Sequence, residues 1–435
     1  MSNSVPEGWR VEKLVDCGIG GISNGVFCDP KKVGSGYKLI NVYEMYQGYG
    51  IDVNLTRRLQ LDKKEFEKNK VNFGDVFFTR SSLKLEGIAY CNINLSNDDD
   101  ITYDGHLMRI VPDRKAVIPE YLARFCLSDD ARKYFMSSAK HSTMTTIAQA
   151  DIAPLPVLLP PLPEQQKIAK ILTSVDDVIE KTQAQIDKLK DLKTGMMQEL
   201  LTRGVGVDGK PHTEFKDSPV GRIPVGWECV QLESLLHQRK NSMRSGPFGS
   251  ALLKHELVPT GYPYLGIDNV HVEHFETSYK RFVSDEKFEQ LKKYAVYEDD
   301  VMITIMGTVG RSCVVPHGLG RALSSKHVWT MTFDQTKYLP SLICWQLNYS
   351  DWVKKQFRNE SQGGVMDSIS SKTLKELWMP VPSLGEQQHF HKIHEALTSQ
   401  IQAKELALKK KRNLKKALMQ DLLTGKVRVK VDSQP

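Results

Sequence analysis

The chain has 435 residues, a length that suggests about three domains with hydrophobic cores of their own. Its net charge of +7 and pI near 8.8 favour an anionic partner only weakly. No apolar run reaches the roughly 18 residues of a membrane span and no signal peptide is evident, so we expect a cytoplasmic protein without a membrane partner.

The seven cysteines, at positions 17, 28, 91, 126, 229, 313 and 344, have no paired spacing and form no C-x-x-C motif. We therefore expect reduced thiols rather than a zinc site or a disulfide framework.

Residues 1–160 form a predicted domain of strands and short helices. Its expected elements are, in chain order, a turn and strand at 6–11, a strand at 36–42, a polar turn and buried strand at 74–79, and a helix at 120–136. The strand at 74–79 ends on a threonine, Thr79. We call this stretch the first domain.

Residues 161–204 predict one long helix. Pro163 suits a first helical position, so we expect the helix to begin near Glu164. Apolar residues at alternating three- and four-residue steps predict a heptad seam: Ile168, Ile171, Val175, Val178, Leu189, Leu192 and Met196, interrupted by the polar Thr182 and Gln185. Roughly forty residues give a rod of about 60 Å, too long for a compact domain to wrap. Its apolar stripe needs a partner helix.

Residues 205–222 read as a linker. Gly204 to Lys210 satisfies G-x-G-x-x-G and resembles a phosphate loop. However, a helix precedes it and Pro211 follows, whereas a phosphate loop joins a strand to a helix. A glycine-rich helix stop is the better interpretation.

Residues 223–382 repeat the first domain. The matching elements are a turn and strand at 224–230, a strand at 261–267, a strand at 299–304 that ends on Thr304, and a helix at 341–357; His327 matches His106. Between these elements the loops differ. A common scaffold with divergent loops is typical of recognition modules.

Residues 383–425 repeat the long helix without a gap. Glu386-Gln387-Gln388 aligns with Glu164-Gln165-Gln166, and the match continues in register to Thr424 over Thr202. A gap-free match indicates that geometry fixes the helix length. The alternating tail, residues 426–435, could add an edge strand to the first domain.

The two long helices supply each other's missing partner. We expect an α+β fold in which two similar mixed domains are separated by an antiparallel coiled coil, with approximate two-fold symmetry. Because antiparallel pairing brings the end of one helix beside the start of the other, the domains should sit at opposite ends of the pair.

No catalytic or metal centre is evident. His389, His391 and His394 cluster at the start of the second long helix, but their spacing does not place all three on one face, and no cysteine or carboxylate completes a ligand set. Serine-hydrolase, metalloprotease and amino-methyltransferase motifs are absent. We therefore expect no catalytic residues, no metal and no enzyme activity in this chain.

Polar and basic loop residues remain as candidates for DNA contact. Their donors suit phosphates and base edges, although any one of them is more often an ordinary surface residue. Most candidates lie at the ends of the two threonine-ending strands or in the loops that follow them, and two more lie at 326–327. They are Thr79, Arg80, Ser82, Lys84, Thr304, Thr308, Arg311, Lys326 and His327.

The whole chain resembles the specificity subunit of type I restriction-modification systems. The most specific features are the two Glu-Gln-Gln helix starts after proline-rich approaches, the helix ends Leu200–Gly204 and Leu422–Gly425, and the re-entry at Ile223–Trp227. The resemblance implies that the two domains are target recognition domains, each reading half of a split DNA sequence. It also implies that the residues listed above from the two matching loops contact double-stranded DNA.

The same resemblance implies the partners and the role of the helices. Two methyltransferase subunits dock on the helix pair, with the Glu-Gln-Gln triplets (Glu164, Gln165, Gln166, Glu386, Gln387 and Gln388) as partner-binding residues, and a translocating nuclease subunit is added. S-adenosylmethionine, ATP and magnesium belong to those partners, so this chain needs no cofactor. The helices act as a ruler that separates the half-sites by about one DNA turn, roughly 34–36 Å.

Two alternatives stay open at this point. The chain could serve a fused methyltransferase-nuclease, which the sequence barely distinguishes from the separate subunits. It could also be a coiled-coil adaptor that binds proteins at both domains and no DNA. Sequence-selective DNA binding, measured at a stated salt concentration, discriminates the adaptor from a specificity subunit.

Overall fold

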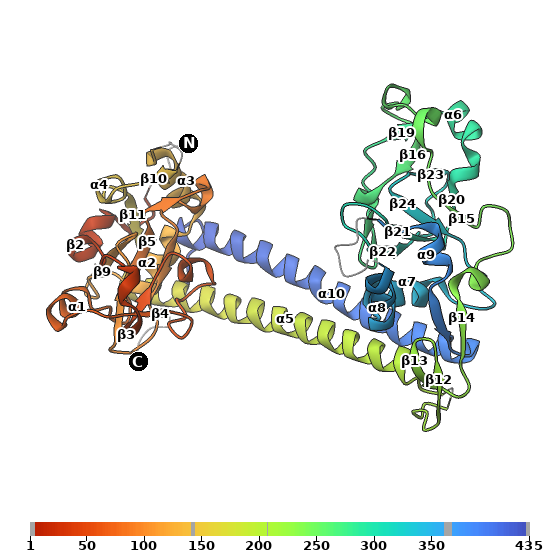
Figure 1. The fold of residues 1–435 in the computed structure, drawn as a ribbon. Helices are drawn as coiled ribbons and strands as arrows, with labels where there is room; N and C mark the ends of the chain where they lie inside the picture. Colours follow the sequence, from red (N-terminus) through yellow and green to blue (C-terminus); the bar gives the residue numbers. More distant parts are fainter. Residues whose placement is uncertain (1–4, 141–143, 207, 361–367, 432–435) are drawn as a thin grey trace. The chain divides into compact units, whose positions relative to one another are not determined.

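The computed structural model describes residues 5–140, 144–206, 208–360 and 368–431. They divide into two compact units. Unit 1 is Met1–Gln185 with Lys404–Pro435, and unit 2 is Ile186–Ala403. Each unit contains one mixed domain and one half of each long helix, α5 (Leu162–Thr202) and α10 (Leu384–Leu423) (Figure 1). Among the described residues, no helix combines the length and apolar character needed to cross a membrane.

A four-stranded sheet forms the centre of unit 1. Its order is β2 (Gly18–Asn24), β9 (Leu107–Pro112), β5 (Val76–Thr79), β7 (Cys91–Ile93), and each neighbouring pair is antiparallel. All four residues of β5 are buried, because helices cover one face of the sheet and a second sheet packs on the other. That second sheet has the order β4 (Arg57–Leu59), β3 (Val33–Ile40), β8 (Ile101–Tyr103), with β3 and β8 parallel.

Unit 2 repeats this topology. Its central sheet has the order β15 (Met243–Arg244), β24 (Val328–Met331), β21 (Val301–Thr304), β22 (Ser312–Val314), again antiparallel throughout. The second sheet contains β16 (Tyr262–Leu265) and β23 (Ala322–Ser324), a parallel pair that corresponds to β3 and β8. The repeat predicted from sequence is therefore confirmed as a repeat of strand order.

The single helices predicted at 120–136 and 341–357 are wrong. Each is broken into two: α2 (Pro119–Cys126) and α3 (Asp129–Ser138) in unit 1, α7 (Pro340–Tyr349) and α8 (Asp351–Glu360) in unit 2. A serine lies at each break. Ser128 takes the N-cap of α3, where its hydroxyl accepts from the amide of Ala131, and Ser350 ends α7 in an extended conformation. Serine competes with helix hydrogen bonding and so favours such boundaries.

Two segments outside the domains also differ from expectation. The predicted linker at 205–222 contains most of a hairpin, β12 (Phe215–Ser218) paired with β13 (Gly221–Pro224). The tail forms no strand in its described part, up to Val431. Instead Val429 packs on the core of unit 1, and Arg428 reaches the start of α5.

The helices pair antiparallel within each unit. In unit 1, Lys415 contacts Asp176, Lys411 donates to Thr182, and Lys404 donates to Gln185, so residue numbers fall along α10 as they rise along α5. In unit 2, Met197, Leu200 and Leu201 of α5 share a core with Phe390 of α10.

The buried seam of α5 differs from the predicted one. At every second position, the buried residue lies one place further along the chain than predicted. Ile168, Leu172, Thr182 and Ile186 are buried, whereas Val178 and Leu192 are 46% and 49% exposed. Both registers offered apolar residues, because Ile171 and Leu172, like Val178 and Ile179, are adjacent. Thr182, predicted to interrupt the seam, lies inside it, and its hydroxyl accepts from Lys411.

Candidate nucleic-acid interface

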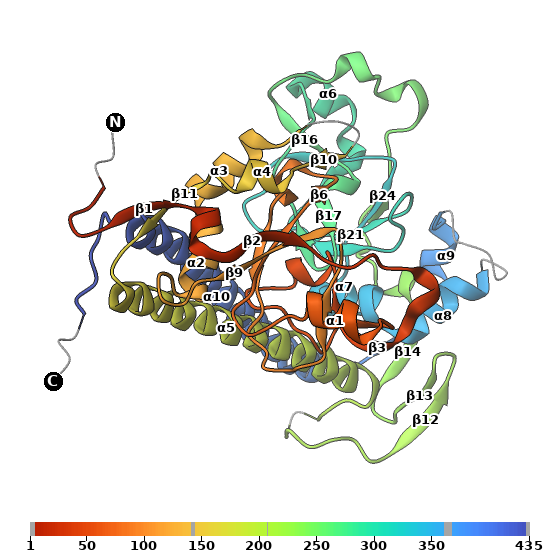
Figure 2. The same cartoon turned by 90° about the vertical axis from the view of Figure 1, so that its left-hand side faces the viewer.

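The polar loops of unit 1 leave the central sheet at one end of its strands. Strands β2 and β5 both run antiparallel to β9 and end where β9 begins, since Asn24 pairs with Met108 and Thr79 with Leu107. Loops 25–32 and 80–90, and the turn 104–106, therefore leave the sheet at the same end of these strands, which we call the loop edge. Figure 2 shows β2 beside β9 in this sheet.

Unit 2 has the same loop edge. Arg244 of β15 pairs with Thr330, and Thr304 of β21 pairs with Val328, so both strands again end where the middle strand β24 begins. The loops that leave this edge are 245–256 and 305–311, together with the turn 325–327. The two units thus present equivalent sets of loops that differ in sequence.

Thr79 and Thr304 close the necks of their loops in the same way. The Thr79 hydroxyl donates to the Gly87 carbonyl at 2.7 Å and accepts from the Tyr90 amide at 2.9 Å. The Thr304 hydroxyl donates to the Thr308 carbonyl and accepts from the Arg311 amide at 3.0 Å. Both threonines are fully buried. We therefore correct their predicted role: their hydroxyls hold the loops and are not available to touch DNA.

The other predicted DNA-contact residues lie at the loop edges with accessible side chains. Arg80 and Lys84 are exposed in unit 1, and Thr308 and Lys326 in unit 2. The remaining three, Ser82, Arg311 and His327, are half-buried. Their contact with DNA stays a prediction.

Two of these residues have an environment that defines their chemistry. Burial, followed by the positive charges of Lys326 and Arg281, lowers the pKa of His327, which keeps its imidazole neutral at neutral pH. A neutral ring offers one donor and one acceptor, the combination that a base edge also presents. Ser82 is held by strand pairing with Thr145, and its hydroxyl accepts from the Lys84 amide at 3.2 Å.

Arg244, at the end of β15 beside loop 245–256, does not belong to the accessible set. It is 4% exposed and forms a buried ion pair with Asp300. Arg109 and Asp75 form a comparable ion pair in unit 1. These charges support the sheet beneath the loops.

The Glu-Gln-Gln triplets join each helix start to its own domain. In unit 1, Glu164 accepts from Trp9 Nε1 at 3.2 Å and from Arg428 at 2.8 Å. In unit 2, Glu386 accepts from Trp227 Nε1 at 3.1 Å and contacts His212 Nε2 at 2.6 Å. We call this arrangement of tryptophan, glutamate and basic side chain the clasp.

The first glutamines extend the clasp to the backbone. Gln165 accepts from the amide of Ile118, and Gln387 accepts from the equivalent Leu339, at 2.8 and 2.9 Å. Four triplet side chains are thus buried and satisfied within the chain, and we revise their role from partner binding to holding the helix start. Gln166 and Gln388 are exposed, and their partner contact stays a prediction.

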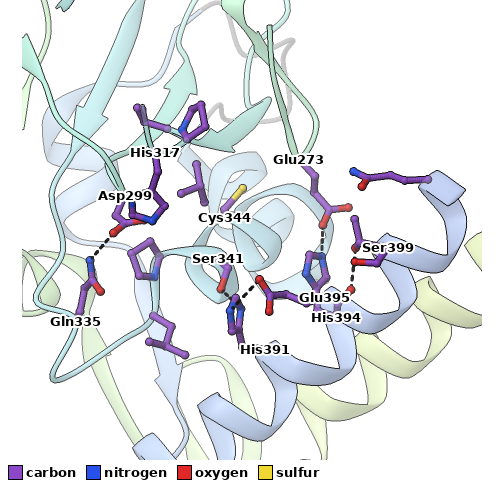
Figure 3. Close-up of a pocket in the computed structure, with 17 residues that line it drawn as sticks. Glu273, Asp299, His317, Gln335, Ser341, Cys344, His391, His394, Glu395 and Ser399 are labelled. Carbon is purple, nitrogen blue, oxygen red and sulfur yellow. Dashed lines mark hydrogen bonds and ion pairs between the residues drawn. The ribbon is translucent and has the colours of Figure 1, made fainter. Parts of the chain in front are cut away.

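A cavity of about 600 Å³ lies in unit 2 between the domain and α10 (Figure 3). His394 contacts Glu273 at 2.5 Å, and His391 contacts Ser341 at 2.9 Å and Glu395 at 3.4 Å. Burial raises the pKa of the Cys344 thiol to about 12, so the thiol is a poor nucleophile. Among the described residues, no group of three or more ligating side chains could hold a metal ion.

Glu273 is a structural residue whose role the sequence did not reveal. It lies at the turn between β17 (Val270–His271) and β18 (His274–Phe275), and it binds Lys193 of α5, His394 of α10 and Tyr349 of α7, all within 3.0 Å. The carboxylate therefore couples the domain to both helices. A glutamate in a hairpin turn has no sequence signature that would have predicted these partners.

The comparisons with known proteins identify the class. The family model described as "type I restriction modification DNA specificity domain" matches residues 27–191 and 224–412. These two stretches make up most of the chain, so the chain belongs to this family. It is accordingly a DNA sequence-specificity subunit of the type I restriction-modification kind.

Individual relatives cover the whole length. The putative type I restriction enzyme MjaX specificity subunit of Methanocaldococcus jannaschii is 27% identical over 430 residues, which span 98% of this chain and 95% of that protein. The type I restriction-modification S subunit from M. genitalium has a TM-score of 0.55 at 13% identity, over 95% of this chain and 96% of that one. A chain from a solved type I R-M system has a TM-score of 0.58 at 15% identity, over 98% and 100%. These structures share the fold.

Replacing the loop-closing threonines by valine should loosen the loops. Thr79→Val or Thr304→Val leaves the amide of Tyr90 or Arg311 without its partner, which costs about 1–3 kcal/mol. We expect faster hydrogen exchange of the Tyr90 or Arg311 amide and a lower melting temperature. Thr79→Ser and Thr304→Ser keep the hydroxyl and should exchange like the wild type. Unchanged exchange in both valine variants would contradict the assigned role.

The clasp should make unit 2 sensitive to acid. Burial raises the pKa of Glu386, but hydrogen bonds from His212, Trp227 and Ser383 together hold it below the ordinary glutamate value. A lowered folded-state pKa stabilises the fold above about pH 4.3, and this contribution is lost as pH falls through the folded value.

We therefore expect Glu386→Gln to destabilise the protein by about 1–3 kcal/mol at pH 7, and by progressively less below about pH 4. Thermal unfolding at both pH values measures the difference. Glu395→Gln, at an exposed position on the same helix, should change stability by less than about 0.5 kcal/mol. A difference for Glu386→Gln that stays constant with pH would refute the charge-based explanation.

Proposed function

We propose that each unit reads one half of a bipartite double-stranded DNA target through its loop edge. The observation that carries this proposal is the duplication: two sheets of the same strand order present equivalent loops of different sequence. A constant scaffold with variable loops suits two readers of unlike half-sites. Accessible Arg80 and Lys84 in unit 1, and Arg311 and Lys326 in unit 2, supply donors for phosphates and base edges.

The paired helices set the spacing of the half-sites in this proposal. They also dock two methyltransferase subunits, to which a nuclease and translocase subunit is added. Their exposed faces, which include Leu192 of α5 and Leu414 of α10, at 49% and 56% exposure, are available for such contacts. S-adenosylmethionine, ATP and magnesium bind to those partner subunits, and this chain contributes recognition rather than catalysis.

Removing one accessible cation from each loop edge tests the proposal. In the complex with methyltransferase partners, Arg80→Ala or Lys326→Ala should weaken binding of the cognate duplex by about 1–3 kcal/mol, roughly 5- to 150-fold. Gel shift at fixed salt measures this, with the target defined by methylome sequencing of a host that carries the subunit. Lys13→Ala on β1 (Arg10–Lys13) and Lys216→Ala on β12 remove exposed cations away from the loop edges and should leave binding unchanged. Equal affinity in all four variants would overturn the interface.

A matched lengthening of both helices tests the ruler. Seven residues inserted after Gln185 and seven after Ala403 preserve the seam, because seven residues make about two turns, and add about 10.5 Å. We expect the unspecified spacer of the methylated sequence to lengthen by roughly three base pairs, as read by methylome sequencing. The same insertion in α5 alone should abolish methylation, since it shifts one helix against the other. An unchanged spacer in the matched variant would refute the ruler.

A further inference from the structure

Large apolar side chains stand exposed on the loops of both loop edges. In unit 1, Phe27 follows β2 and is 81% exposed, and Leu83 follows β5 and is 84% exposed. In unit 2, Phe248 follows β15 and is 54% exposed, and Met306 follows β21 and is 48% exposed. The loops that follow equivalent strands in the two units thus each carry one exposed apolar side chain, which we call the apolar tip of the loop.

The repetition makes these tips informative. A single exposed apolar residue is ordinary on a protein surface and needs no explanation. Here the loops have different sequences and lengths, yet the apolar tip recurs after both matching strands. Leu83 and Met306 differ in side chain and share only size, position and exposure. The recurring property is therefore an apolar side chain that projects from the loop edge.

The loops that carry the two apolar tips of unit 1 are anchored by hydrogen bonds. Arg132 donates to three carbonyls of loop 80–90, those of Glu86, Ile88 and Ala89, at 2.6–2.9 Å. Beside Phe27, Val26 is 3% exposed and bridges to Asp104 at the neighbouring turn. A tip on an anchored loop can enter a partner without first ordering the loop, which lowers the entropic cost of binding.

The chemistry around the tips favours DNA as the occupant. Leu83 lies in sequence between Arg80 and Lys84, and Phe27 is followed by Lys31 and Lys32, against the single acidic residues Glu86 and Asp29 in these loops. In unit 2, Arg311 lies in the loop of Met306, and Lys326 lies in the neighbouring turn. Cations beside an apolar tip match a duplex, which has phosphates outside and an apolar base stack inside.

We infer that Phe27 and Leu83 in unit 1, and Phe248 and Met306 in unit 2, are wedges that insert between adjacent base pairs of their half-sites. The inference rests on the proposed function. Phe, Leu and Met are among the side chains that unstack base steps and kink a duplex. Each half-site is then selected in part by how easily its steps deform, in addition to hydrogen bonding at base edges.

Fluorescence of 2-aminopurine, which rises when the base is unstacked, tests the wedges. The full chain in complex with methyltransferase partners is bound to cognate duplexes that carry one 2-aminopurine at successive positions of each half-site. We expect a rise at discrete steps in both halves. Phe27→Ala or Leu83→Ala should reduce the rise severalfold in one half only, and Phe248→Ala or Met306→Ala in the other half only.

Two exposed apolar residues away from the loop edges serve as matched controls. Ile19 is 62% exposed at the opposite end of β2, and Val225 is 48% exposed beside β13. Ile19→Ala and Val225→Ala should leave the fluorescence rise intact. Selective binding by the wild type without any rise, or a rise that all four wedge variants retain, would overturn the wedges alone. Loss of affinity with an unchanged rise would indicate surface contact and would also overturn insertion. Absence of selective binding by the wild type would overturn the proposed function, and the wedges with it.

Discussion

The buried carboxylate at the start of each long helix is the interaction on which the architecture depends. Glu164 and Glu386 lie inside the protein, and a buried carboxylate is tolerated only when it is paired. In each unit two donors come from segments distant in sequence: a tryptophan that opens the domain, and a basic residue beyond the end of a long helix. In unit 1 that residue, Arg428, lies 264 positions from Glu164. Each helix start is therefore complete only when three separate segments have assembled.

This constraint also fixes the position of the loop edges. With the helix start fixed to the domain by Gln165 or Gln387, the central sheet has a defined attachment to the helix pair of its unit. The loops inherit their position from the strands, and the buried Thr79 and Thr304 close each loop at its neck. Variation in sequence can then concentrate beyond the threonine, in residues 80–90 and 305–311, without disturbing the core. The loops can therefore differ in sequence while the strands that carry them stay the same.

The sequence predicted the repeating architecture well because helix length and strand order leave periodic signals. The long helices begin and end within two residues of their predicted bounds, 161–204 and 383–425. The errors arise where tertiary partners decide between local alternatives. Ile171 and Leu172 are both apolar, so only packing chooses which one enters the seam. Each helix predicted in a domain is interrupted at a serine. The alternating tail forms no strand in its described part, and its Arg428 pairs with Glu164.

Burial was the main quantity that the sequence could not supply at the site. Thr79 and Arg80 are adjacent polar residues, and both suggested DNA contact, but only Arg80 is accessible. Polar residues on a recognition loop divide into those that hold the loop and those that face outward, and the division depends on strand register. Glu164 and Gln166 divide in the same way. The repeated Glu-Gln-Gln sequence therefore reflects the attachment of each helix start to its domain as much as binding to any partner subunit.

The two units also differ in the sign of the charge that each domain presents to the helices. Lys193 and Lys415 occupy equivalent positions of the duplicated helix, 222 residues apart like Glu164 and Glu386. Lys415 finds its carboxylate on the other helix, at Asp176, which also binds Arg124 of the unit 1 domain. Lys193 finds its carboxylate on the unit 2 domain, at Glu273. The unit 1 domain thus presents a cation to the helices, and the unit 2 domain an anion. Exchanging the domains would bring like charges together or leave charges buried and unpaired, which costs several kcal/mol. Two similar domains are in this way each matched to one set of helix halves.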